Sequence, residues 1–169
     1  MKTIILFIIT MFVSGCASTY KQSTVTHANK KLISGGNMVI ATPKNGSYGN
    51  ILYHESGRMT AQEVSAAFAK FVNTAISPNC LDLKCLKQGK IKYDYYVVPV
   101  ILHWEDRATE WSGILDKLEV KLSVYGSDGD EELASTIISG KSKWMTFGGD
   151  HPQDLLPEPI GEYVESLFK

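Results

Sequence analysis

Side chains that could bind a ligand or catalyse a reaction gather in two stretches of the chain. The candidates are His103, Glu105, Asp106, Arg107, Glu110 and Trp111 in the first stretch, and Trp144, Asp150 and His151 in the second. A His-x-Glu pair on a strand places both side chains on one face, which suits metal ligands or an acid–base pair. Neighbouring Asp and Arg side chains equally suit a surface network of ion pairs. We predict a candidate binding surface, with no catalytic set and no metal site.

The tryptophans allow a sharper interpretation than the charged residues do. Trp104 and Trp144 fall on predicted strands, so we expect them to pack in the core or against the sheet. Trp111 falls in a loop beside Ser112 and Gly113. It could pack beneath that loop, or it could be an exposed anchor for a partner. The sequence contains no nucleophile elbow, P-loop, dinucleotide fingerprint or metalloprotease helix.

A different chemistry is indicated at the N-terminus, around Cys16. The apolar run from Thr3 to Val13 follows Met1-Lys2 and is shorter than the roughly 20 residues of a membrane-spanning helix, which is typical of a signal peptide. Residues Val13 to Cys16 (VSGC) resemble a lipobox. We therefore predict that residues 1–15 are removed and that Cys16 carries a covalent lipid, the only bound group we expect. An ordinary secreted protein with a chance cysteine is the alternative.

The residue after Cys16 and the other two cysteines indicate a compartment. Ala17, rather than Asp, follows Cys16, which favours the outer membrane as the location of the anchored protein. Cys80 and Cys85 are expected to form a disulfide in the oxidising periplasm. Residues five apart on a regular helix are too far apart to be bridged, so the bond requires an irregular turn. A metal-binding pair is the weaker alternative.

Length and charge place the mature chain in a simple class. The full sequence of 169 residues has a net charge of −1 and shows no basic block, so nucleic acid is not an expected partner. We predict a lipidated Cys16 with a flexible tether over residues 16–36, followed by a single globular periplasmic domain over residues 37–169.

Hydrophobic patterns predict one mixed sheet with helices packed on it, an α/β (α+β) fold in the order β-α-β-β-β-α. A strand at 37–42 precedes a Gly-rich loop at 43–58, which is long enough to suggest a function and carries Tyr48. A capping box at Thr60 to Glu63 predicts a helix from there to about Ala75. A short helical piece at 80–88 follows, then strands at 93–104, 118–124 and 133–145, a loop at 146–159, and a closing helix from Ile160.

Two long strings carry a family resemblance. HWEDRATEWSG, which begins at His103, and FGGDHPQDLLPEP, which begins at Phe147, resemble an uncharacterised family of proteobacterial lipoproteins, a domain of unknown function. The resemblance implies a lipid-anchored domain facing the periplasm and no established activity. The order of the elements is similar to that of the TolB N-terminal domain and of the penicillin-binding-protein activator LpoB, which is an analogy of fold alone.

Three functions remain open at this point. The favoured one is a non-enzymatic accessory lipoprotein of the outer membrane that binds another envelope component, either a protein or a glycan. The second is a module that binds a small ligand or a glycan, because aromatic faces beside carboxylates and Arg suit sugars. The third is a metal-dependent hydrolase that uses His103 or His151.

Overall fold

Six strands form one mixed sheet at the centre of the protein. The computed structural model describes residues 18–107, 114–128, 130–143 and 151–169, with the strand order β1-β8-β7-β6-β2-β5. The strands are β1 (Thr19–Thr26), β2 (Asn37–Ala41), β5 (Asn73–Ser77), β6 (Tyr95–Glu105), β7 (Lys117–Gly126) and β8 (Glu132–Lys141). β2 runs parallel to β5 and β6, whereas the other neighbours are antiparallel. The predicted mixed α+β fold is confirmed.

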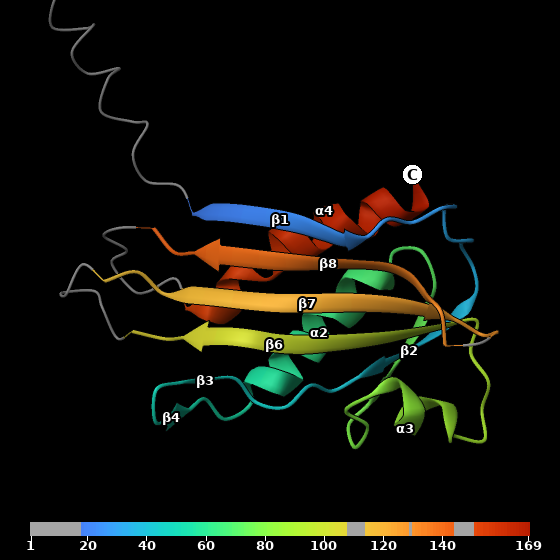
Figure 1. Ribbon diagram of the computed structural model, residues 1–169, viewed down its shortest axis with the longest axis horizontal. Coiled ribbons are helices and arrows are strands. Elements are labelled where there is room, and N and C mark those ends of the chain that lie inside the picture. Colours follow the sequence, from blue (N-terminus) through green and yellow to red (C-terminus); the bar gives the residue numbers. More distant parts are fainter. Residues whose placement is uncertain (1–17, 108–113, 129, 144–150) are drawn as a thin grey trace, which may run out of the picture.

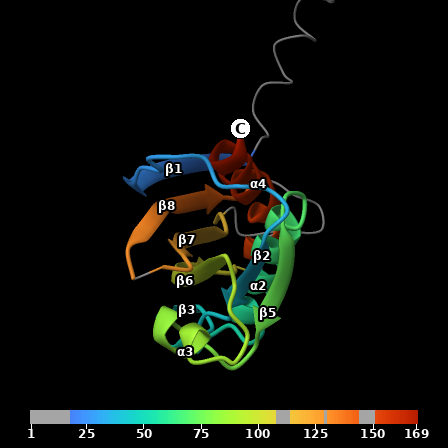
Figure 2. The same cartoon turned by 90° about the vertical axis from the view of Figure 1, so that its right-hand side faces the viewer.

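Two helices cover one face of this sheet and a third lies against the other. α2 (Ser56–Phe68) and α4 (Pro157–Phe168) pack side by side on one face (Figure 1, Figure 2). The short helix α3 (Leu83–Lys87) packs on the opposite face against β2 and β6. A small hairpin, β3 (Ser47–Tyr48) and β4 (Ile51–Leu52), and a 3-10 helix, η2 (Pro152–Leu155), complete the described elements. In the part of the chain that the structure describes, no helix covers β1, β8 and most of β7 on that opposite face, which we call the open face.

The core lies between the sheet and the helices α2 and α4. Alternate residues of β7, Leu118 to Val124, are buried against these helices, whereas Lys117 and Glu119 lie on the open face. This is the alternation expected of an antiparallel strand with one buried face. Trp104 of β6 is only 1% exposed within the same core, so the prediction that it is a core residue is confirmed.

The first strand corrects the prediction of a flexible tether over residues 16–36. Residues 19–26 form β1, which pairs with β8 along its length, for example Tyr20 with Gly140. The polar composition that suggested a tether belongs to an edge strand whose side chains stay largely exposed. Polar edge strands are common because apolar ones promote aggregation. The ordered domain therefore begins much closer to Cys16 than residue 37.

The boundaries of α2 also differ from the prediction. The helix begins at Ser56 and ends at Phe68, so Thr60 does not cap it; the Thr60 hydroxyl donates to the Ser56 carbonyl inside the helix at 2.8 Å. A Cβ on Gly57 would lie 2.2 Å from the Pro43 carbonyl oxygen, so the first turn fits only with glycine there. Residues 73–75, predicted as the end of the helix, belong instead to β5, where pairing with β2 satisfies their backbone groups.

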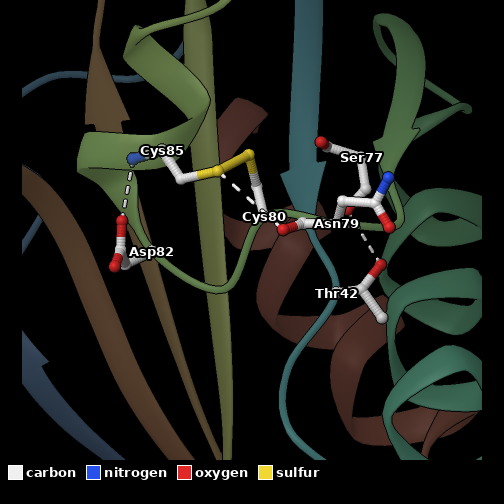
Figure 3. Close-up of a disulfide and its surroundings, with 6 residues drawn as sticks. All are labelled: Thr42, Ser77, Asn79, Cys80, Asp82 and Cys85. Atoms are coloured by element: carbon white, nitrogen blue, oxygen red, sulfur yellow. Dashed lines mark hydrogen bonds between the residues drawn. A yellow bond between two sulfur atoms is a disulfide. The ribbon is translucent and has the colours of Figure 1, made fainter.

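The predicted disulfide between Cys80 and Cys85 is present. It closes an irregular turn with a Cα–Cα distance of 5.3 Å, and the Asp82 carboxylate caps α3 by accepting the amide of Cys85 at 2.8 Å (Figure 3). The Cys80 carbonyl accepts the amide of Thr42, which follows β2, at 2.9 Å. The bond therefore holds α3 against a second small core on β2 and β6, which includes Leu86 from α3.

Candidate functional site

Four strands begin or end at one end of the sheet, and this brings distant parts of the chain together. Thr19 of β1 lies opposite Lys141 of β8, Lys141 lies opposite Lys117 of β7, and Lys117 lies opposite Glu105 of β6. We call this end, which is on the left in Figure 1, the Glu105 end of the sheet. It holds the described members of the predicted binding surface.

An irregularity in β6 sets the orientation of its last residues. The β6–β7 register shifts between Ile101 and His103, and beyond it Trp104 pairs with Leu118 on the core side. His103 and Glu105 therefore share the open face, as the His-x-Glu pattern predicted. Bulges of this kind commonly re-aim side chains at the end of a strand.

Glu105 is the centre of an ion-pair network. Its side chain is only 1% exposed and accepts from Arg107 Nε at 2.6 Å, while His103 Nε2 lies 3.1 Å and Lys117 Nζ 3.4 Å from its other oxygen. Burial raises the pKa of Glu105, but the hydrogen bonds from Arg107 and His103 and the nearby positive charges outweigh it and lower the pKa overall. Glu105 is therefore an ionised, fully paired carboxylate. This matches the surface network of ion pairs that the sequence offered as an alternative to metal ligands or an acid–base pair.

An aromatic ring from the β3–β4 hairpin covers this network. The Arg107 guanidinium lies 4.9 Å from the centroid of the Tyr48 ring and donates to the Tyr48 hydroxyl at 3.1 Å. The His103 ring meets the same ring edge-on at 5.4 Å. Sequence reasoning placed Tyr48 in a loop of suspected function but not in this set, and the length of that loop was the only signal available. Tyr48 is 37% exposed, so the stack is accessible to a partner.

Two further contacts tie the neighbouring loops to the same end. His151 Nδ1 lies 3.2 Å from Asp106 Oδ1, and this hydrogen bond raises the pKa of His151. Asp116 is buried and accepts the backbone amide of Arg107, while its own amide donates to the Ser142 hydroxyl at 2.9 Å. Burial raises the pKa of Asp116 despite that accepted amide. The sequence alone did not single out Asp116, Lys117 or Ser142.

The predicted binding surface is therefore assembled in part. His103, Glu105, Asp106, Arg107 and His151 lie together at the Glu105 end. Asp154 lies one turn away, where its carboxylate accepts the His151 amide at 2.9 Å. Several predicted residues lie outside the described residues, namely Cys16, Glu110, Trp111, Trp144 and Asp150.

Beside the network, the open face of the sheet carries a shallow hollow of about 470 Å³. Two cross-strand rows line it: Thr19, Lys141 and Lys117 form one, and Lys21, Ser139, Glu119 and His103 form the other. Ser139 donates to the Glu119 carboxylate at 3.0 Å. Cations therefore outnumber carboxylates around the hollow.

Two negative findings apply to the described residues only. Within residues 18–107, 114–128, 130–143 and 151–169, no three His, Cys, Asp or Glu side chains are grouped so that they could hold a metal ion. In the same part of the chain, no helix is long and apolar enough to cross a membrane.

The fold and the paired network define a small mixed α+β domain with a polar, partly aromatic sheet end. The chain belongs to the family described as a domain of unknown function (DUF4823), whose model matches residues 30–167. The prediction of an uncharacterised family is thereby confirmed. No curated protein matches the sequence.

Solved structures share the fold at low sequence identity. PelC from Paraburkholderia phytofirmans, described as a dodecamer, matches with a TM-score of 0.63 at 11% identity over 89% of this chain and 97% of that chain. A DUF330 protein from Xanthomonas campestris matches with a TM-score of 0.54 at 14% identity over 85% and 90%. Lipoprotein GNA1162 from Neisseria meningitidis gives 0.47 at 11% identity over 77% and 96%. At such identities the likeness to PelC and to the DUF330 protein shows the fold alone.

Proposed function

We propose that this protein is a lipoprotein of the bacterial outer membrane that binds another envelope component through the Glu105 end and performs no catalysis itself. The lipobox-like residues Val13 to Cys16 support attachment through a lipid on Cys16, with the domain in the periplasm. A binding role, in contrast to an enzymatic one, is supported by the ion pairs that the charged side chains of the site form with one another.

The observation that carries this proposal is the pairing inside the Glu105 network. Glu105 is paired with Arg107, His103 and Lys117, and the lowered pKa of Glu105 keeps it ionised rather than available as an acid. A general acid or base works best with a pKa near the working pH. What the network presents outward is a stacked Tyr48 and Arg107, and Tyr and Arg are the side chains enriched where binding energy concentrates.

A substitution pair tests the proposal in the lipidated protein. Tyr48→Ala and Arg107→Ala are expected to lower co-purification of the envelope partner by about tenfold or more, since such anchors often contribute more than about 2 kcal/mol. Arg58→Ala is the matched control, because Arg58 is also exposed and paired with a glutamate, Glu55, but lies on α2. Thermal unfolding of each variant shows whether the fold is kept. Unchanged co-purification with well-folded Tyr48→Ala would contradict the proposal.

Assembly with further copies of the same chain is a second candidate. It is favoured by the similarity to PelC, which is described as a dodecamer and of which this chain covers 97%. Light scattering on the mature chain would show a mass many times that of one copy if the domain assembles by itself. A monomer across a wide concentration range would remove this candidate and leave a different envelope component as the partner.

A further inference from the structure

We propose that the lysines around the open-face hollow dock the domain onto the phosphate headgroups of the membrane that holds its lipid. The proposal rests on lipid attachment at Cys16, which is part of the proposed function. It adds an orientation: the edge of the open face at β1 and β8 lies against the bilayer surface, whereas Tyr48 and Arg107 lie beyond β7, at β6.

The short distance along the chain to the anchor is the first support. Cys16 precedes Thr19, the first residue of β1, by three positions. Three extended residues span at most about 11 Å, so β1 cannot begin far from a lipid on Cys16. Thr19 itself lines the hollow and is paired with Lys141. Because β1 is a strand of the sheet and not a tether, the anchor holds this end of the domain at the membrane.

The charges are the second support. Lys117 and Lys141 face each other directly across β7 and β8, an arrangement of like charges that destabilises a sheet. Lys117 is partly neutralised by Glu105, at 3.4 Å. Among the residues that the structure describes, Lys21 and Lys141 have no carboxylate within ion-pair distance. An anion from outside the domain would relieve this repulsion.

The physical scale of the interaction fits a membrane surface. Each lysine near an anionic bilayer adds about fivefold to binding, and the attraction fades beyond a screening length of about 10 Å in 0.1 M salt. The connection from Cys16 to Thr19 spans at most about 11 Å, which is similar to this screening length. The lipid also keeps the lysines at a high local concentration of headgroups, so even a few charges suffice to orient the domain.

Vesicle binding of an unlipidated mature chain tests the proposal. The protein from residue 16 onward, with Cys16→Ser, is sedimented with phosphatidylcholine vesicles with and without phosphatidylglycerol. We expect binding that requires phosphatidylglycerol and weakens as salt is added. The double variant Lys21→Gln/Lys141→Gln is expected to lose roughly 25-fold in partitioning, since each lysine contributes about fivefold. It leaves the Lys117–Glu105 pair intact, so the fold should be kept.

A matched double variant controls for net charge. Lys84 and Lys90 are exposed on and just after α3, at the other end of the sheet, and Lys84→Gln/Lys90→Gln removes the same charge. We expect this control to change binding by less than about twofold, because these lysines lie at the other end of the sheet and the attraction to the bilayer fades beyond a screening length of about 10 Å. Equal losses in both double variants, or equal binding to vesicles with and without phosphatidylglycerol, would overturn the proposal. Neither result depends on a protein partner, so failure here is distinct from failure of the proposed function.

Discussion

For Glu105, the residue pattern predicted which face of the sheet the side chain lies on, but it did not decide the chemical role of that side chain. The His-x-Glu spacing placed His103 and Glu105 on one face, and the bulge after Ile101 preserves that arrangement. The pattern left a metal site, an acid–base pair and an ion-pair network open. The network could not be selected from the sequence, because Tyr48 and Lys117 reach Glu105 and Arg107 only through tertiary structure. Local patterns contain no information about such long-range contacts.

Removing the charge of Glu105 should cost stability but not the fold. We expect Glu105→Gln to lower the free energy of unfolding by about 2 kcal/mol, because hydrogen bonds to charged groups contribute about 1.5–3 kcal/mol each and the freed cations can be hydrated instead. His103, Arg107 and Lys117 are each about a third or more exposed, which permits that hydration. Urea unfolding at neutral pH measures the loss. An unchanged midpoint would show that the network contributes nothing to stability.

Sequence patterns predicted two strands wrongly, namely β5 and β1, and β1 was expected to be part of a flexible tether. Its side chains are polar because it is an edge strand with little burial, and composition alone does not separate such a strand from a linker. The β6–β7–β8 meander was predictable, since alternating burial in β7 repeats every second residue. The β5 strand was not, because its apolar residues also fit the period of the preceding helix.

The attachment of β1 should depend on pH through Glu132. The Glu132 carboxylate accepts from Thr26 of β1 at 2.6 Å and also from Ser135. Burial raises the pKa of Glu132, but these hydrogen bonds and the charge of Lys121 outweigh it and lower the pKa to about 2. A lowered carboxyl pKa stabilises the fold above the unfolded value of 4.5, and the contribution is lost as the pH falls toward 2.

Glu132→Gln is the corresponding variant. It should be less stable than the parent by about 2 kcal/mol at neutral pH, and the gap should narrow as the pH falls to about 3. Urea unfolding at both pH values measures this. A gap that is the same at both would mean that the ionised carboxylate is not what fastens β1.

The disulfide is the element-scale feature that the sequence predicted in full. Loss of the Cys80–Cys85 bond should cost about 2 kcal/mol on the chain-entropy model for so short a loop. The effect should be local, because the bond holds α3 against the small core of Leu86, Tyr96 and Val98. Hydrogen exchange of Cys80→Ser/Cys85→Ser should therefore show faster exchange in α3 than in β7. Uniform loss of protection across the sheet would contradict a local role.

At the scale of the whole molecule, the two faces of the sheet have different roles. One face is closed by α2 and α4 and forms the core (Figure 1, Figure 2). The other face presents lysines and the Glu105 network at the end of the sheet where β1 begins. The sequence predicted the mixed α+β fold class. The sequence did not predict that the first residue of β1 and the Glu105 network lie at the same end of the sheet, which follows from the β1–β8 register.

The central claim is that the Glu105 end is the binding surface, and site-specific photocrosslinking in living cells tests it most directly. A photoreactive amino acid replaces Tyr48 in the lipidated protein, and a second variant carries it at Gln88, an exposed position that ends α3 at the other end of the sheet. Mass spectrometry then identifies the adducts. We expect one dominant envelope adduct from position 48 and none of comparable yield from position 88. Equal adducts from both positions, or none from position 48, would contradict the account.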